Sequence, residues 1–387
     1  MSTQKPKRRT RYRGKNPRHF SEKYKEHAPE RYARDVAKVI ASGKTPAGMH
    51  RPVMVREIME VLTPQAGELA VDCTLGYGGH AVALLTALQP GGRLIGLDVD
   101  PIELPKTEAR LRTLGFGLDT LTVHRTNFAG LASVLPEPAD VVFADLGLSS
   151  MQMDNPTRGF TYKYDGPLDL RMNPQRGQPA SALLASLDEP ALAALFLENA
   201  DEPNADRMAQ AILQASVSTT TQLATVIRRT GGDEDTVRRV FQALRIAVND
   251  EFGALDAFLR NLPFCLKAGG RVAILTFHSG EDRRVKKSFQ SGERRGAYSE
   301  VAHEVLRATS EELRANPRSR SAKLRWARRS AMDARNGASV EQNTATSQTQ
   351  HNGRFAADEI KPQHCADTSK KCQELPRFRA PRLLHSR

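Results

Sequence analysis

A glycine-rich turn between two acidic residues is the first feature of the chain that could do chemistry. Residues 71–80 (VDCTLGYGGH) lead from an apolar run through Asp72 into the turn. Glycine suits such a turn because it adopts unusual dihedral angles and lets a ligand approach the backbone. Asp98 ends the next apolar run, twenty residues after Gly78. A carboxylate at that spacing can accept hydrogen bonds from an adenosine ribose, so the pattern predicts an adenosine-containing cofactor.

Two cofactors of this kind fit the turn, namely NAD and S-adenosylmethionine. The nicotinamide fingerprint G-x-G-x-x-G, counted from Gly76, reaches Ala81 at its third glycine, which only its relaxed form permits. Asp72 favours the other cofactor, because a carboxylate repels a pyrophosphate but attracts the sulfonium and ammonium groups of S-adenosylmethionine. We therefore expect S-adenosylmethionine, with a nicotinamide-dependent oxidoreductase as the alternative.

A further acidic residue, Asp145, follows the apolar run at residues 141–144. Ligands of parallel sheets bind at the carboxyl ends of the strands, so this carboxylate is expected to face the cofactor. The alternative is a loop or helix-capping aspartate. Residues 158–172 then interleave aromatic side chains with Lys and Arg. A flipped-out base and its phosphates would require such a mixture, although a loop cluster without substrate contacts would also contain it.

Five apolar runs predict the strands that position these residues, and most of them are separated by helix-length segments: 69–73, 93–97, 121–123, 141–144 and 271–276. This alternation predicts an α/β fold whose parallel sheet is covered by helices on both faces. About 125 residues separate the last two runs, far more than one crossover helix needs. We therefore expect an insertion after the fourth strand.

Helices are predicted inside this insertion at residues 180–200, 205–215 and 236–259. In the last of these, apolar residues form one stripe, and a neighbouring stripe holds Gln242, Arg245 and Asn249. The polar stripe could face a ligand or only solvent. Nearer the C-terminus, Ala322, Leu324 and Trp326 alternate with Lys323 and Arg325, which predicts a strand at the rim of the sheet with its basic side outward.

The net charge of +13 over 387 residues makes polyanions plausible partners. Residues 1–25 carry +9 and residues 314–329 carry +7, so the rest of the chain carries −3. We interpret the first segment as a disordered arm that neutralises phosphates, with a solubilising tail or import signal as the alternative. No apolar run approaches the roughly 20 residues of a membrane span, and four scattered cysteines favour a reducing, cytoplasmic setting.

Four parts of the chain are expected from these patterns. Residues 1–47 form a basic extension, residues 48–153 and 240–329 a catalytic domain, residues 154–239 a helical insertion for substrate recognition, and residues 330–387 a low-complexity tail. The tail holds His364, Cys365 and Cys372, whose irregular spacing does not predict a zinc site. No metal is expected, and the oligomeric state stays open.

Eight motifs occur in one order along the chain: residues 50–54 (HRPVM), 76–80 (GYGGH), 145–150 (DLGLSS), 158–160 (RGF), 165–172 (DGPLDLRM), 241–246 (FQALRI), 277–283 (FHSGEDR) and 316–325 (NPRSRSAKLR). The order of these motifs resembles that of the ribosomal RNA small-subunit methyltransferase H family, also called MraW. The resemblance covers about residues 48–329. The resemblance implies a class I methyltransferase, a Rossmann-like doubly wound sheet with a helical insertion after the fourth strand. It also implies methyl transfer from S-adenosylmethionine to N4 of a cytidine in the decoding region of small-subunit (16S) rRNA.

The resemblance places the cofactor contacts at seven residues: Gly78, Gly79, His80, Asp98, Phe128, Asp145 and Gln152. A cytosine amino group needs an acceptor for its proton, for which we expect Asp145 and, as a second candidate, Asp169. The base must leave its stack, and its expected contacts are Arg158, Phe160, Tyr162, Arg171, Arg245 and His278. The partner would be free rRNA or an assembled small subunit.

Two departures from the family pattern bear on a non-enzymatic alternative. Residues 200–204 (ADEPN) replace a Gly-Glu-Glu stretch, so that only Glu202 matches, and Gly280 stands where the family usually has leucine. The altered Gly-Glu-Glu stretch favours a ribosome-assembly factor with a degenerate cofactor pocket, whereas the intact Asp98, Asp145 and residues 165–172 argue against it. A DNA amino-methyltransferase is disfavoured, because residues 146–148 (LGL) stand where that group has a Pro-Pro-aromatic segment.

Overall fold

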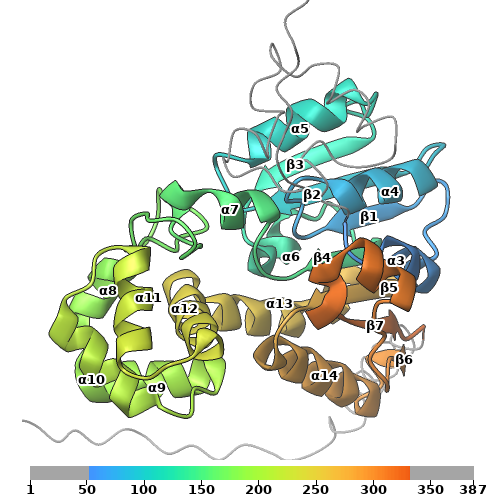
Figure 1. Ribbon diagram of the computed structural model, residues 1–387. Helices are drawn as coiled ribbons and strands as arrows, with labels where there is room; N and C mark the ends of the chain where they lie inside the picture. Colours follow the sequence, from blue (N-terminus) through green and yellow to red (C-terminus); the bar gives the residue numbers. More distant parts are fainter. Residues whose placement is uncertain (1–51, 332–387) are drawn as a thin grey trace, which may run out of the picture. The chain divides into compact units, whose positions relative to one another are not determined.

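The computed structural model describes residues 52–331, and these contain a single seven-stranded sheet (Figure 1). The strands are β1 (Leu69–Asp72), β2 (Arg93–Asp98), β3 (Leu121–Arg125), β4 (Ala139–Asp145), β5 (Leu266–Thr276), β6 (Tyr298–Val301) and β7 (Lys323–Arg329). Their order across the sheet is β3-β2-β1-β4-β5-β7-β6. Neighbours among β1–β5 pair in parallel, and β7 is antiparallel to both β5 and β6.

This topology confirms the doubly wound, Rossmann-like sheet predicted from the sequence. The chain runs outward from β1 to β3 and then returns to β4 on the other side of β1, which creates a switch point between β1 and β4. Ligands of such sheets bind at this point, outside the carboxyl ends of the strands. All five predicted strands are present, each within a few residues of its predicted bounds.

Helices cover both faces of the sheet. One face packs against α3 (Val55–Leu62), α4 (Gly79–Ala87) and α5 (Leu104–Thr113), and the other against α6 (Leu131–Val134), α13 (Glu251–Cys265) and α14 (Ser279–Arg294). Ala70 and Val71, adjacent on β1, belong to the two different hydrophobic cores. Because successive side chains point to opposite faces, a strand buried on both faces appears in the sequence as an unbroken apolar run.

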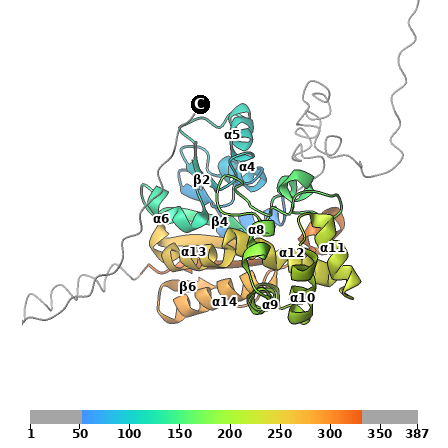
Figure 2. The same cartoon turned by 90° about the vertical axis from the view of Figure 1, so that its left-hand side faces the viewer.

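Five helices between β4 and β5 form the insertion, and Figure 2 shows them grouped together. They are α8 (Ala180–Ser186), α9 (Glu189–Ala200), α10 (Ala205–Ala215), α11 (Thr220–Arg229) and α12 (Glu234–Asn249). A separate hydrophobic core joins them, with Phe196, Met208, Leu223 and Leu244 fully or almost fully buried. The helix α12 passes without a break through residues 239 and 240, where the sequence suggested the end of the insertion.

Two of the predicted helices are interrupted. The segment 180–200 forms α8 and α9, because the side chain of Asp188 accepts a hydrogen bond from the N–H of Ala191 and so begins a new helix. The segment 236–259 forms parts of α12 and α13, which are separated by Asp250 in a left-handed conformation with φ 48°. The remaining predicted helix, at residues 205–215, matches α10 at both ends.

The prediction that β7 forms the rim of the sheet was wrong, since β7 lies between β5 and β6. The two basic side chains expected to point outward, Lys323 and Arg325, do not do so either. Arg325 is 5% exposed, and its Nε donates to Oδ1 of Asp282 at 2.6 Å, while Nζ of Lys323 lies 3.1 Å from Oδ2 of the same carboxylate. A buried cation is retained only when it is paired, and Asp282 supplies the pairing charge.

Between residues 52 and 331, no helix combines the length and apolar composition needed to cross a membrane. The expected basic arm at residues 1–25 lies outside the described residues, as do His364, Cys365 and Cys372 of the tail.

Candidate active site

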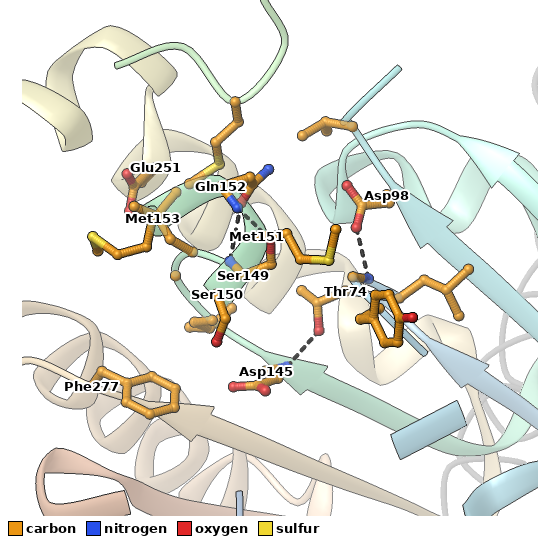
Figure 3. A pocket seen from close by; sticks show the side chains of 18 of the residues that line it. Thr74, Asp98, Asp145, Ser149, Ser150, Met151, Gln152, Met153, Glu251 and Phe277 are labelled. Carbon is orange, nitrogen blue, oxygen red and sulfur yellow. Dashed lines mark hydrogen bonds between the residues drawn. The ribbon is translucent and has the colours of Figure 1, made fainter. Parts of the chain in front are cut away.

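A cavity of about 600 Å³ opens at the carboxyl ends of the central strands (Figure 3). One wall comes from the sheet side and includes residues 73–80, Asp98, Phe128 and residues 145–154. The opposite wall includes Gln242, Arg245 and Asn249 of α12, Glu251 of α13, and His278 and Glu281 at the start of α14. The switch point of the sheet therefore carries a pocket that the insertion helps to close.

The glycine turn between β1 and α4 forms the floor of this pocket. Gly76 and Gly78 have φ values of +49° and +74°, which L side chains rarely adopt. A Cβ on Gly78 would lie 3.1 Å from Cγ2 of Thr107, and a Cβ on Gly79 would lie 3.0 Å from the ring of Pro52. Side chains at Gly78 and Gly79 would therefore crowd their neighbours, and without them the backbone of both residues lines the pocket.

Asp98 ends β2 and is tied to this turn. Its Oδ2 accepts a hydrogen bond from the N–H of Gly76 at 2.8 Å (Figure 3). Its Oδ1 accepts one from the N–H of Asp100 at 2.9 Å. Burial raises the pKa of Asp98 to about 6. Each carboxylate oxygen has a further lone pair, so this group can still accept hydrogen bonds from two ribose hydroxyls.

Asp145 ends β4, and its carboxyl group faces the pocket. Its N–H donates to Oγ1 of Thr74 at 2.6 Å (Figure 3), but within residues 52–331 no hydrogen bond reaches its carboxyl oxygens. Burial raises the pKa of Asp145 to about 8, and the negative charges of Asp72 and Glu281 add to this effect. A cationic ligand in the pocket would favour the ionised form of this group, and an ionised carboxylate that is poorly solvated is a strong acceptor for a proton.

Two aromatic rings complete the sheet-side wall. The imidazole of His80 packs against the ring of Phe143, with centroids 4.7 Å apart, and its Nε2 lies 2.9 Å from the carbonyl oxygen of Val53. Phe128 begins a short 3₁₀ turn after β3 and packs edge-on against Phe258, with centroids 5.5 Å apart. Both lie in the pocket lining, and both are among the cofactor contacts that the resemblance implies.

Gln152 lies in α7 (Ser150–Asp154), where a buried hydrogen-bond network fixes its side chain. Its Nε2 donates to Oδ2 of Asp100 at 2.8 Å, and its Oε1 accepts from the N–H of Ser149 at 3.0 Å. Asp100 is 1% exposed and was not singled out from the sequence. The only signal for it was a second acidic residue two positions after Asp98, which is also typical of an ordinary turn.

Arg158 occupies a different place from the substrate contact that was expected. It is 6% exposed, its Nη1 donates to Oδ2 of Asp100 at 2.8 Å, and its Nη2 donates to the carbonyl of Met172 at 2.8 Å. It is absent from the pocket lining within the described residues. Arg158 therefore fixes the carboxylate of Asp100, to which Gln152 also donates, from outside the pocket lining.

Other expected substrate and catalytic residues also lie outside the pocket lining in the described part of the chain. Phe160 is buried in the insertion core, and Tyr162 packs against Phe241 with ring centroids 5.1 Å apart. Arg171 binds both carboxylate oxygens of Asp169, at 2.7 and 2.8 Å. Burial opposes ionisation of Asp169, but the hydrogen bonds and charge of Arg171 outweigh it and hold the pKa of Asp169 below its ordinary value. This pairing makes Asp169 a poor proton acceptor.

Arg245 and His278, two of the expected substrate contacts, line the pocket. Nε and Nη2 of Arg245 donate to the two oxygens of Glu251 at 2.7 and 2.9 Å, and Nε2 of His278 lies 3.1 Å from Oε1 of Glu281. Donor atoms of Glu251, His278 and Glu281 lie within 4.8 Å of one another. The guanidinium of Arg245 already satisfies Glu251 and would repel a cation, so this cluster fits a polar ligand better than a metal ion.

The chain matches the model of the MraW methylase family over residues 47–330. It is 50% identical over 341 residues to ribosomal RNA small subunit methyltransferase H 2 of Alkaliphilus metalliredigens, covering 84% of this chain and 98% of that relative. It is 48% identical over 338 residues to ribosomal RNA small subunit methyltransferase H 1 of Lachnoclostridium phytofermentans, covering 83% of this chain and 92% of that relative.

Among solved structures, an rRNA methylase from Streptococcus thermophilus matches with a TM-score of 0.34 and 12% identity, covering 71% of this chain and 93% of that one. That likeness is too remote to add to the topology. The match to the family model and the identity to the two relatives extend across both walls of the pocket. The chain therefore belongs to the MraW methylase family and is a class I methyltransferase that uses S-adenosylmethionine.

Proposed function

We propose that this protein methylates N4 of a cytidine in the decoding region of small-subunit rRNA. The names of its relatives, which refer to ribosomal RNA of the small subunit, support this substrate. The observation that carries the proposal is Asp145, a pocket carboxyl group whose oxygens receive no hydrogen bond from residues 52–331 and whose pKa is raised to about 8.

S-adenosylmethionine, when bound, supplies a methyl group on a cationic sulfur atom, so that a positioned nucleophile is all the transfer requires. The residues present fit this cofactor. Gly78 and Gly79 leave the backbone open, and Asp98 offers carboxylate oxygens for the ribose. Phe128 and Gln152 bound the same half of the pocket, and the acidic groups near it suit a cationic ligand.

Asp145 performs the proton transfer in this proposal. The lone pair of a cytosine amino group is delocalised into the ring, so the amine becomes nucleophilic as it loses a proton. Asp145 would accept a hydrogen bond from this amine, orient it and then take its proton. The second wall of the pocket, with His278, Glu281 and Arg245, would surround the base after it leaves its stack.

Nucleoside mass analysis of small-subunit rRNA, from cells with and without the gene, tests the modification. We expect N4-methylcytidine to disappear from one position when the gene is removed and to return when it is restored. An unchanged nucleoside profile would contradict the proposal. Full restoration by the Asp145→Asn variant would instead overturn the assignment of Asp145 as the proton acceptor.

The form of the substrate is tested separately, with free rRNA and assembled small subunits as alternative methyl acceptors for the purified protein. We place this reaction in the cytoplasm, where both forms of the substrate occur. The acceptor that is methylated at the lower protein concentration is the physiological partner.

A further inference from the structure

The imidazole of His80 is held between the backbone and the proposed proton acceptor. Its Nε2 lies 2.9 Å from the carbonyl oxygen of Val53, and its Nδ1 lies 3.7 Å from Oδ2 of Asp145. The ring packs against Phe143, and its side chain is 9% exposed. His80 is the second residue of α4, so the helix fixes the position from which the ring reaches Asp145.

The contact with Val53 determines which ring nitrogen carries the hydrogen. A carbonyl oxygen can only accept, so Nε2 of His80 must be the donor. Burial lowers the pKa of His80 to about 4, which keeps the ring neutral near pH 7. Nδ1 therefore has a lone pair and no hydrogen, and the nearest carboxyl oxygen of Asp145, Oδ2, lies 3.7 Å from it.

A lone pair in this place has opposite effects on the two forms of Asp145. It repels an ionised carboxylate oxygen, but it can accept a hydrogen bond from a protonated one. The charged groups around Asp145 act in the same direction, because Asp72 on β1 and Glu281 on α14 are both acidic. Among the other charged residues of the pocket lining, Arg245 pairs with Glu251, His278 with Glu281 and Arg318 with Asp154.

We propose that Nδ1 of His80 accepts a hydrogen bond from Oδ2 of Asp145 once that carboxyl group has taken a proton from the substrate amine. His80 is then a positioning residue that acts through Asp145, and this role rests on the proposed function of Asp145. In the step itself, the new C–N bond would form as the bond between the methyl carbon and the cofactor sulfur breaks and leaves its electron pair on sulfur. One N–H bond of the amine breaks at the same time, and its electron pair stays on nitrogen. The proton forms an O–H bond at Oδ2, where Nδ1 holds it until it is released to water.

Two substitutions separate this role from simple packing. His80→Gln can still donate to the Val53 carbonyl but offers no acceptor at the position of Nδ1. His80→Asn places its Oδ1 near that position but does not reach Val53. Thermal unfolding of both variants serves as the control for the integrity of the fold, and transfer rates are measured at saturating cofactor because His80 is itself an expected cofactor contact.

The titration of the Asp145 carboxyl carbon, followed by NMR in the cofactor-free protein and assigned with Asp145→Asn, gives a readout without catalysis. We expect the midpoint to fall by about one pH unit in His80→Gln, as the loss of one hydrogen bond to the protonated form predicts, and to stay near the wild-type value in His80→Asn. An unchanged midpoint in His80→Gln, or an equal fall in both variants, would overturn the proposal.

The rate of methyl transfer in a single turnover gives the second readout. We expect His80→Gln to be about tenfold slower than the wild type and His80→Asn to be within about threefold. If the wild-type protein methylates no cytidine, the proposed function fails, but the NMR titration still decides the role of His80. If neither variant folds, the ¹⁵N chemical shift of Nδ1 in the wild type decides the role of His80. A chemical shift that does not change when Asp145 becomes protonated excludes the hydrogen bond.

Discussion

Arg158 and Asp100 form an ion pair in which both side chains are buried. Nη1 of Arg158 lies 2.8 Å from Oδ2 of Asp100, and the two side chains are 6% and 1% exposed. The same Oδ2 accepts a hydrogen bond from Gln152 at 2.8 Å. This pair joins the segment that leads into the insertion to the loop after β2, on the cofactor side of the pocket.

Replacing Arg158 by Ala should destabilise the protein, because it leaves the carboxylate of Asp100 buried without its partner. Loss of one member of a buried pair typically costs about 3–5 kcal/mol of unfolding free energy. We also expect weaker cofactor binding, since Gln152 loses the support of a fixed Asp100. Urea denaturation and calorimetric titration measure the two effects. Arg176, which is exposed, provides the control; a variant Arg158→Ala as stable as Arg176→Ala would contradict this account.

The stability of the cofactor-free protein should depend on pH through Asp145. The pKa of this carboxyl is raised from 3.8 to about 8 in the folded chain, so its contribution is full below the unfolded value and is lost as pH rises through about 8. Asp145→Asn lacks this dependence, whereas Asp72, with its pKa raised to about 7, contributes in both proteins. We therefore expect Tm of the wild type to fall relative to Asp145→Asn between pH 5 and pH 9. Parallel curves from scanning calorimetry would refute it.

Asp169→Asn should disturb structure more than chemistry, because Asp169 is bound by Arg171 and lies outside the pocket lining. The pair is partly exposed, so we expect a loss of about 1 kcal/mol in unfolding free energy and a transfer rate within about twofold of the wild type. Asp145→Asn should instead slow transfer by about 100-fold or more with little change in cofactor affinity. The opposite ranking of the two variants in a single-turnover assay would make Asp169 the proton acceptor.

Removal of residues 1–25 should weaken RNA binding, because this segment carries a charge of +9. Fewer phosphate contacts release fewer counterions, so the slope of log Kd against log salt should also become flatter. Cofactor affinity should not change. Removal of residues 341–352, which are nearly uncharged, is the matched control, and an equal effect of both deletions on RNA binding would show that the charge is not the cause.

The sheet was predictable from the sequence because β1, β2, β4 and most of β5 are buried on both faces and so form apolar runs. The helix breaks at Asp188 and Asp250 were missed, because the apolar period continues across them while a single residue changes the backbone direction. The pairing of Arg325 was also missed. Its partner Asp282 is more than forty residues away in sequence, and no local pattern reports a contact of that range.

The cofactor half of the pocket was predicted better than the substrate half. Asp98, Asp145 and the glycine turn follow directly from strand ends, whose place in a doubly wound sheet is fixed. Arg158, Phe160 and Tyr162 lie in an irregular segment, where residue type alone does not reveal which side chains face inward. Arg158 is buried because it pairs with Asp100, which is distant from it in the sequence.

The two walls of the pocket have different consequences for the design of inhibitors. The wall formed by Asp98 and the glycine turn is built from features that any doubly wound nucleotide-binding sheet shares. The wall formed by Gln242 and Arg245 comes from α12, whose own core lies in the insertion. A small molecule confined to the first wall would therefore be expected to bind many unrelated enzymes. One that also reaches α12 would gain its selectivity from a part of the chain that those enzymes do not have.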